Sequence, residues 1–231
     1  MATTTRGSPA ARVPPTTTGA STGAAATAAT GARTGPLPRP QRQAAILRAA
    51  AEAFARSGYA GTSMEAIAAE AGITKLIVYR HFDTKEDLYR AVLQRVFDRL
   101  ADEFIAGIAA GPDDPGVGAR SMLTAAREDP AGFRLLWRHA AREPRFAAYA
   151  AELRERAVDA SRMLLGGLVA PPLREWAAHA VVGFLVEATL EWLEHGDPAR
   201  DETFVRLTTD ATVAMVAAWI DATPGPEAPG P

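Results

Sequence analysis

The chain has 231 residues, of which 48% are hydrophobic, so it can bury a large core in one or two domains. It contains no cysteine, which excludes a disulfide scaffold, a thiolate metal site and a cysteine nucleophile. The net charge of −2 divides unevenly, because residues 1–100 carry 13 Lys and Arg against 7 Asp and Glu, whereas residues 101–231 carry 12 against 20. A basic first part is typical of a nucleic-acid-binding protein, although an ordinary solvated surface explains the same numbers equally well.

The two ends of the chain have compositions that cannot form a core. Residues 1–38 are almost entirely Ala, Thr, Gly, Pro and Arg, and residues 223–231 are mostly Pro and Gly. We expect both to be disordered tails. The N-terminus has no apolar segment of the signal-peptide type, and the longest apolar stretch, 176–193, is interrupted by His179, Glu187 and Glu191. We therefore expect a cytoplasmic protein that does not bind membranes.

Beyond the first tail, apolar residues recur at three- and four-residue steps, which predicts helices. The first helix is expected to end at Gly58, a residue type common just after helix ends. A second begins at Thr62, which has the spacing of a capping box with Glu65, and ends at Gly72. A longer helix begins at Thr84, with acidic residues in its first turn.

Five more helical segments follow, separated by Gly and Pro residues, and none shows the polar–apolar alternation of a strand. They lie at about 118–129, 131–142, 145–168, 174–195 and 201–222. The predicted fold class is all-α, with about nine helices. We expect a short N-terminal helical domain at 39–88, followed at 89–222 by a larger helical bundle.

The stretch AGITKLIVYRHF, residues 71–82, contains a run of branched and aromatic residues, 76–79, that β-propensity alone would assign to a strand. As a helix, it places Val78 and Phe82 together, toward the preceding helix, and leaves Leu76 exposed. Two short helices joined by a turn containing Gly72 have the spacing of a helix-turn-helix motif. An exposed leucine on the leading turn can contact the C5-methyl group of thymine in a major groove.

The polar residues around Leu76 have the chemistry to bind DNA. Lys75 can donate to guanine or to a phosphate, and Tyr79 and His81 can donate to phosphate oxygens. Lys85 lies at the start of the next helix, where its charge and the helix N-terminus would act together on an anion. The candidate DNA-binding residues are Thr62, Ser63, Thr74, Lys75, Leu76, Ile77, Tyr79, Arg80, His81 and Lys85.

Residues 58–93 closely resemble the DNA-binding region of TetR-type transcriptional regulators. The residues that match the family pattern are Gly58, Tyr59, Thr62, Ser63, Met64, Ile67, Ala68, Ala71, Gly72, Thr74, Tyr79, His81, Phe82, Lys85, Glu86 and Leu88. The chain departs from the pattern at Leu76 and Ile77, where the family often has Gly and Thr. The departure leaves the expected fold intact, but a base preference of the family does not carry over to these two positions.

The resemblance implies a homodimer that places one recognition helix of each subunit in successive major grooves. The target would be a near-palindromic operator with half-sites roughly 34 Å apart or slightly more. The last two helices, about 173–195 and 202–221, would form the dimer interface, and they carry more apolar residues than one buried face needs. The candidate interface residues are Trp176, Val181, Leu185, Phe204, Val213, Val216 and Ile220.

The resemblance also implies a cavity in the larger domain whose small-molecule effector releases the protein from DNA, which favours a repressor. The candidate pocket residues are Phe133, Trp137, Tyr149, Phe184, Glu187 and Trp192. Two alternatives stay open: a constitutive DNA-binding protein without a ligand, and a helical-bundle enzyme that uses Glu187 and Glu191. We expect no catalytic site, cofactor or metal site, because His139 and His179 are isolated in sequence and the common catalytic motifs are absent.

Overall fold

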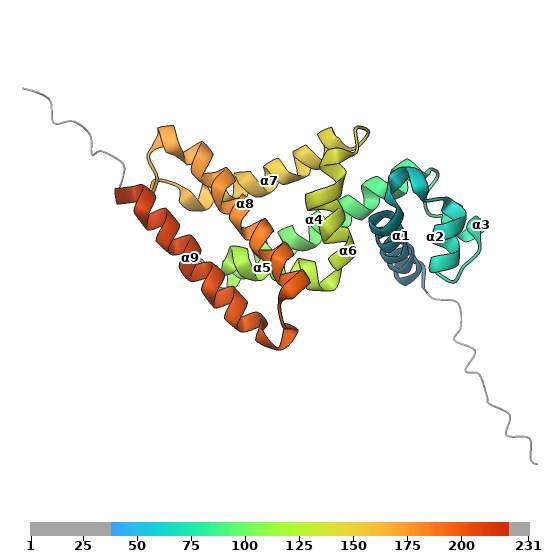
Figure 1. Ribbon diagram of the computed structural model, residues 1–231, viewed down its shortest axis with the longest axis horizontal. Coiled ribbons are helices and arrows are strands. Elements are labelled where there is room, and N and C mark those ends of the chain that lie inside the picture. The colour runs from blue at the N-terminus through green and yellow to red at the C-terminus, as the bar shows by residue number, and fades with distance from the viewer. Residues whose placement is uncertain (1–37, 222–231) are drawn as a thin grey trace, which may run out of the picture. The chain divides into compact units, whose positions relative to one another are not determined.

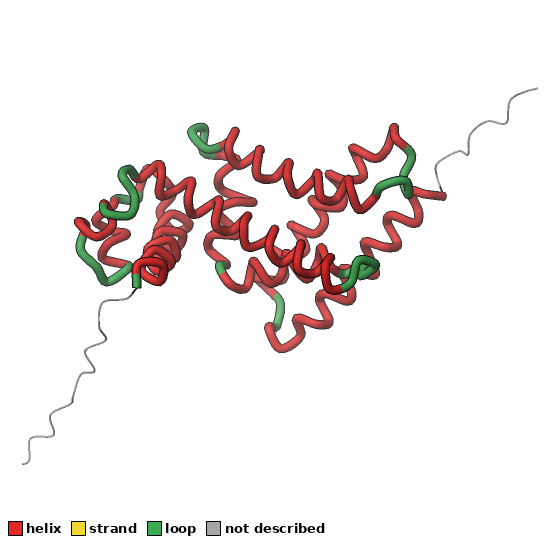
Figure 2. Tube along the Cα trace, turned by 180° about the vertical axis from the view of Figure 1, so that it is seen from behind, coloured by secondary structure: helices red, strands yellow, loops and turns green. Residues whose placement is uncertain are grey.

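Nine α-helices make up most of the part of the chain that this computed structural model describes, residues 38–221 (Figure 1). No strand occurs within that range (Figure 2). The predicted tails lie outside it, apart from Pro38. The all-α fold class is therefore confirmed for the described residues. The helices are α1 (Arg39–Gly61), α2 (Met64–Glu70), α3 (Lys75–Tyr79), α4 (Lys85–Ala110), α5 (Val117–Glu128), α6 (Pro130–Arg134), α7 (Ala147–Leu165), α8 (Pro171–His195) and α9 (Asp201–Asp221).

Short helical turns connect some of these elements. A π-helical turn, Leu135–His139, and a 3₁₀ turn, Ala140–Arg142, follow α6, and a second 3₁₀ turn, Pro198–Arg200, precedes α9. None of the described helices is long and apolar enough to cross a membrane.

Two glycines with positive φ interrupt the chain where the sequence predicts. Gly58 breaks α1 at φ 69°, and Gly72 follows α2 at φ 65°, a left-handed conformation that other residues rarely adopt. The start of α2 differs from the prediction by one residue. Its N-cap is Ser63, whose hydroxyl accepts a hydrogen bond from the amide of Ala66 at 3.1 Å. Thr62, the predicted cap, instead turns inward against α1.

Helix α4 belongs to both predicted domains. Its N-cap is Thr84, as predicted, and the Thr84 hydroxyl accepts from the amide of Asp87 at 3.0 Å. The helix runs without interruption for 26 residues and contacts α1 as well as α5, α6 and α7 (Figure 1). The domain boundary predicted between residues 88 and 89 therefore lies inside one rigid element that the two parts share.

Helix α8 is apolar nearly all round because it has neighbours on several sides. It contacts α5, α7 and α9, and buries eight of its side chains. Packing within one chain therefore accounts for much of the apolar surface that the sequence assigns to a dimer interface.

An aromatic cluster, Phe54, Tyr59, Tyr89 and Phe146, joins the first helices to the start of α7. Phe146 is fully buried just before α7 and stacks on Tyr89 of α4, with ring centroids 4.0 Å apart. It also meets Tyr59 edge-on at 4.8 Å, and Phe54 of α1 contacts Tyr89 at 4.9 Å. Burial, with a smaller effect of nearby Glu143, raises the pKa of Tyr89 above its usual range. The cluster ties α1, α4 and the start of α7 together.

Asp129 is a buried carboxylate at the N-terminus of α6. One oxygen accepts from the amide of Gly132 at 2.8 Å, which caps the helix. The other oxygen is buried and has no hydrogen-bond partner among the described residues. Burial raises the pKa of Asp129, although the Gly132 amide and the charges of Arg95 and Arg48 act in the opposite direction.

We expect Asp129→Asn to be more stable relative to wild type at neutral pH than in acid. The native pKa of Asp129 is raised, so its stabilising contribution is fully present only below the unfolded pKa of about 3.9 and is lost as pH rises through the native pKa. Asparagine keeps the cap without this pH dependence. Thermal unfolding of both proteins between about pH 7 and pH 4 measures the difference. A difference in Tm between the two proteins that stays constant or grows on acidification would contradict the raised pKa of Asp129.

Candidate nucleic-acid interface and ligand cavity

Helix α3 presents its predicted outer face to solvent. Val78 is fully buried and Phe82 is 7% exposed, which confirms the two predicted core positions. Leu76 is 62% exposed and Tyr79 is 40% exposed, an unusual placement for large apolar side chains on one short helix. Ile77 is partly buried beside them. The predicted orientation of α3 is therefore correct.

Lys75 is exposed and forms an ion pair with Glu65 across the turn between α2 and α3. Its ammonium group also lies 5.4 Å from the centroid of the Tyr79 ring. The hydrogen bond to Lys75 lowers the pKa of Glu65, so this carboxylate stays charged beside the candidate interface. To contact DNA, Lys75 has to leave Glu65 or share its hydrogen bonds with it.

Arg80 and Thr74 are exposed, and neither side chain has a hydrogen bond or ion pair within residues 38–221. Thr74 is the N-cap residue of α3, yet its hydroxyl makes no capping bond. Ser63 is also exposed, with its hydroxyl on the Ala66 amide. His81 is partly buried, and burial, aided by Arg39 and Arg42, lowers the pKa of its imidazole. The lowered pKa favours the neutral form of the imidazole.

Two predicted DNA-binding residues have structural roles instead. Thr62 is 3% exposed, and its hydroxyl lies 2.7 Å from the carbonyl of Gly58 and 3.1 Å from that of Ala53, so its inclusion is corrected. Lys85 donates to the carbonyls of Tyr59 and Thr62, both at 2.8 Å, and lies 4.3 Å from the Tyr59 ring centroid. Its ammonium group therefore anchors the start of α4 to the end of α1, and any phosphate contact would compete with these bonds.

A cavity of about 310 Å³ lies among α4, α5, α7, α8 and α9. Sixteen of its 21 lining residues are apolar, and four of the other five are Ser or Thr, so the wall is hydrophobic. Helix α4 contributes residues from Phe97 to Ile105, and α7 contributes residues from Arg156 to Leu164.

None of the six predicted pocket residues lines this cavity, so the cavity does not support that prediction. Phe133 and Trp137 are buried in the core, and Tyr149, Phe184 and Trp192 pack partly buried against it. Glu187 is exposed and forms an ion pair with Arg138 at 3.3 Å, so it does not bury an unpaired charge in the apolar helix α8. The cavity is lined mainly by small and aliphatic side chains from five helices, a set that aromatic content in the sequence does not reveal.

The seven predicted dimer residues divide into two groups. Trp176, Val213 and Ile220 are exposed on α8 and α9, and Val216 is partly buried. Val181 and Leu185 instead line the cavity, and Phe204 is buried and stacks on Trp192 with centroids 5.2 Å apart. These last three predictions are corrected, since their side chains are already covered within one chain.

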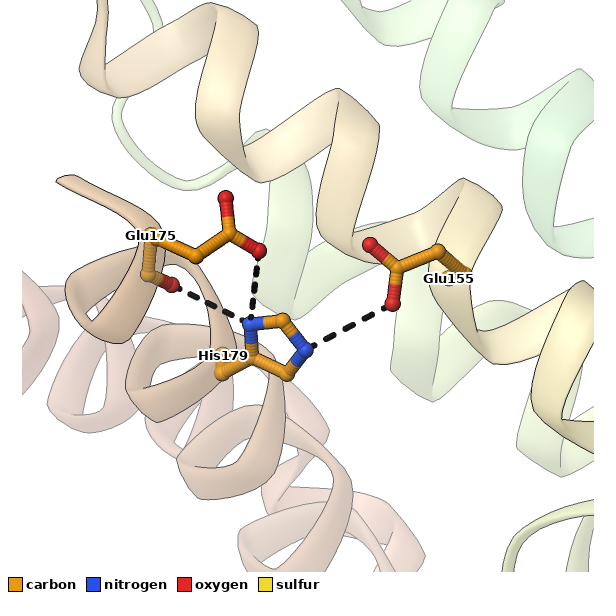
Figure 3. Close-up of side chains that lie close together, drawn as sticks. All are labelled: Glu155, Glu175 and His179. Atoms are coloured by element: carbon orange, nitrogen blue, oxygen red, sulfur yellow. Dashed lines mark hydrogen bonds and ion pairs between the residues drawn. The ribbon is translucent and has the colours of Figure 1, made fainter.

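His179, which is isolated in sequence, has two acidic neighbours in space. Its Nε2 atom lies 3.5 Å from Glu155 of α7, and its Nδ1 atom lies 3.5 Å from the carboxylate of Glu175 (Figure 3). All three are exposed, and Arg162 pairs with both glutamates. A guanidinium therefore already pairs with both carboxylates, and the cluster acts as an ionic link between α7 and α8 of modest stabilising effect. His195 similarly pairs with Glu191 at 3.6 Å.

Comparisons with known proteins agree with this arrangement. A family model described as bacterial regulatory proteins of the tetR family matches residues 46–92, which contain α2 and α3. The HTH-type transcriptional activator FasR of Mycolicibacterium smegmatis is 33% identical over 184 residues, covering 74% of this chain and 81% of that protein. The HTH-type transcriptional repressor Rv3405c of Mycobacterium tuberculosis is 43% identical over 68 residues, 29% of this chain and 36% of that protein.

Solved structures share the fold. A TetR-like transcriptional regulator from Rhodococcus superposes with a TM-score of 0.65 at 23% identity, over 79% of this chain and 99% of that chain. AibR, solved in complex with isovaleryl coenzyme A and operator DNA, superposes with a TM-score of 0.58 at 22% identity, over 74% and 97%. The sequence similarity to FasR covers 74% of this chain and therefore extends far beyond the helix-turn-helix unit. The chain belongs to the TetR family of DNA-binding transcriptional regulators.

Proposed function

We propose that the protein represses transcription by binding a near-palindromic operator as a homodimer, and that a small molecule in the cavity releases it. The observation that carries this proposal is helix α4. Its first half packs in the core of the helix-turn-helix unit through Leu88 and Val92, and its second half forms part of the cavity wall through Phe97, Leu100 and Phe104. A ligand that displaces this wall would also tilt the DNA-binding unit.

The outer face of α3 supports the DNA-binding part of the proposal. Leu76 is the leading apolar contact, with Thr74 and Arg80 beside it as polar groups that have no competing partner in the described chain. Lys75 exchanges its bond to Glu65 for one to a base or a phosphate. Electrostatic attraction to phosphates supplies general affinity, and Leu76 and Lys75 distinguish between bases.

Exposed apolar side chains on α8 and α9 support a homodimer. Leu173, Trp176, Leu207, Val213 and Ile220 are each more than one-third exposed. A second copy covering both helices would remove this surface from water. Two copies related by a twofold axis match a palindromic site, with each α3 in one half-site.

Activation of transcription is the alternative to repression, and one observation favours it. A repressor needs only to occupy the promoter, which favours repression. FasR, the relative that is similar over most of its length, is named an activator, and this observation favours activation. The relatives are named transcriptional regulators, which supports a role without catalysis.

Run-off transcription from the protein's own upstream DNA with purified RNA polymerase tests the proposal. We expect the full-length protein to lower the amount of transcript from this template, and to leave a template with a shuffled upstream sequence unaffected. An increase would instead establish activation. Equal transcription from both templates at every protein concentration would contradict both signs of regulation.

A further inference from the structure

The polar groups of the cavity wall restrict the chemistry of a ligand, because almost all of their hydroxyl donors already form hydrogen bonds within the protein. The hydroxyls of Ser121, Thr209 and Thr212 donate to the carbonyls of Val117, Val205 and Thr208 on their own helices, at 2.7 to 2.8 Å. Each of these hydroxyls has therefore used its one donor. A hydrogen-bond acceptor of the ligand placed against them would lose its water without gaining a donor in return.

Two polar groups remain at the wall, both on α7. Ser161 is 8% exposed, and its hydroxyl makes no hydrogen bond within the described residues. Arg156 is half exposed, pairs with Glu152 at 2.7 Å, and holds its guanidinium 5.9 Å from the centroid of the Phe97 ring. A cationic group therefore marks the end of the cavity formed by the earlier residues of α7 and α4.

The opposite end of the cavity has an exposed apolar rim. Ile105 is 65% exposed, Met163 74% and Leu164 47%, and all three line the cavity. From Phe97 to Ile105 on α4, and from Arg156 to Leu164 on α7, the lining extends over about 12 Å of each helix at the rise of 1.5 Å per residue. The cavity is thus elongated, with a cation at one end and an open hydrophobic edge at the other.

Resting on the ligand-responsive function proposed above, we infer that the effector is an amphiphile with an unbranched hydrocarbon chain and an anionic head. The chain lies along α4 and α7 against Leu100, Phe104 and Met122, and the head pairs with Arg156 in place of Glu152. The tail covers the apolar rim at Met163 and Leu164. Such a molecule buries hydrocarbon against hydrocarbon and places its charge where the wall supplies an opposite charge.

Calorimetric titration of the full-length protein with hexanoate, octanoate, decanoate and dodecanoate tests the inference. Each added methylene group that is buried should strengthen binding about fourfold, until the chain fills the cavity. Decanoate should bind more tightly than decan-1-ol, and Arg156→Gln should remove that difference. Affinity that does not rise with chain length, or a preference for decanol that Arg156→Gln leaves unchanged, would overturn the inference.

Two substitutions locate the binding site. Ala160→Trp places a large side chain in the cavity and should abolish decanoate binding, whereas Ala151→Trp, at an exposed position of the same helix, should bind as wild type. Met163→Glu changes an exposed rim residue that the fold does not need, so it serves even if Ala160→Trp does not fold. It should weaken dodecanoate more than hexanoate. Wild-type affinity for the whole series in Met163→Glu and Ala160→Trp would overturn the inference.

A parallel DNA-binding titration separates this inference from the proposed function. If decanoate binds in the cavity and DNA affinity stays unchanged, the cavity binds amphiphiles as inferred, but the inference that such a molecule is the effector is overturned. If the acids do not bind, while a compact polar compound binds in the cavity and lowers DNA affinity, the inference is overturned and the proposed function stands.

Discussion

Replacing Leu76 by glutamate is expected to abolish sequence-specific DNA binding without unfolding the protein. The side chain is 62% exposed on the outer face of α3, so a polar group there costs the core nothing, and its effect on stability should stay within about 0.5 kcal/mol. On DNA, the new carboxylate meets phosphates and base edges that present negative charge. Like-charge contact of this kind costs several kcal/mol, so we expect affinity to fall by a factor of about 100 or more.

Fluorescence anisotropy with labelled upstream DNA measures this loss, and thermal unfolding checks the fold. Leu168→Glu is the matched control, because Leu168 is a leucine of similar exposure, 59%, in the turn after α7. It should bind DNA as wild type does. Normal DNA binding by Leu76→Glu would exclude α3 as the contacting helix.

The substitution Leu76→Gly tests which group of the DNA Leu76 contacts. If it packs on a thymine methyl group, replacing thymine by uracil in the half-site should weaken wild-type binding but leave Leu76→Gly unaffected. Equal wild-type affinity for both versions of the site would exclude methyl recognition.

Phe146→Ala is expected to have the largest effect on stability. Phe146 is fully buried against Tyr89 and Tyr59, and loss of its ring leaves a cavity where the start of α7 meets α1 and α4. Truncation of a buried phenylalanine costs about 3–5 kcal/mol, which for a chain of this size lowers Tm by roughly 10 °C. Thermal unfolding followed by circular dichroism measures the change, and a loss below about 1 kcal/mol would contradict the packing.

Phe146→Leu distinguishes a role of Phe146 in stability from a role in transmitting ligand binding to the DNA-binding helices. The shorter side chain keeps the protein folded but loses the stacked contact with Tyr89, so ligand should release DNA less effectively. Phe204→Leu is the control, since Phe204 is also buried and stacked on an aromatic ring, but between α8 and α9. It should lose comparable stability and keep the response to ligand. If Phe204→Leu lost the response to ligand and Phe146→Leu kept it, the effect of ligand on DNA binding would instead pass through α8 and α9.

Local patterns in the sequence predicted the helices and the orientation of α3. Gly58, Gly72 and Thr84 act where they are expected, because glycine conformation and capping depend on a few neighbouring residues. The position of Leu76 followed from helical periodicity once Val78 and Phe82 were assigned to the core. The N-cap of α2 is Ser63 and not the predicted Thr62, because both residues have the same capping chemistry and only tertiary packing selects between them.

Patterns in the sequence do not reveal the cavity. Its wall combines residues such as Ala101, Gly118 and Ala160, which come from three helices and carry no chemical signature of their own. Of the predicted aromatic pocket residues, Phe133 and Trp137 lie in the core, and the other three pack partly buried against it. Lys85 gave a misleading signal as well, since a lysine beside a helix N-terminus suits an anion, yet its donors meet two backbone carbonyls. Those carbonyls belong to a turn whose path depends on Gly58.

The most direct test of the DNA-reading role is the affinity of the full-length protein for its own upstream DNA, compared with a shuffled sequence of the same length and composition, at about 150 mM salt. Specific binding through the α3 face predicts a preference for the native sequence of about 1,000-fold or more, and the loss of that preference in Leu76→Glu. Equal affinity of the wild-type protein for the two sequences would contradict it.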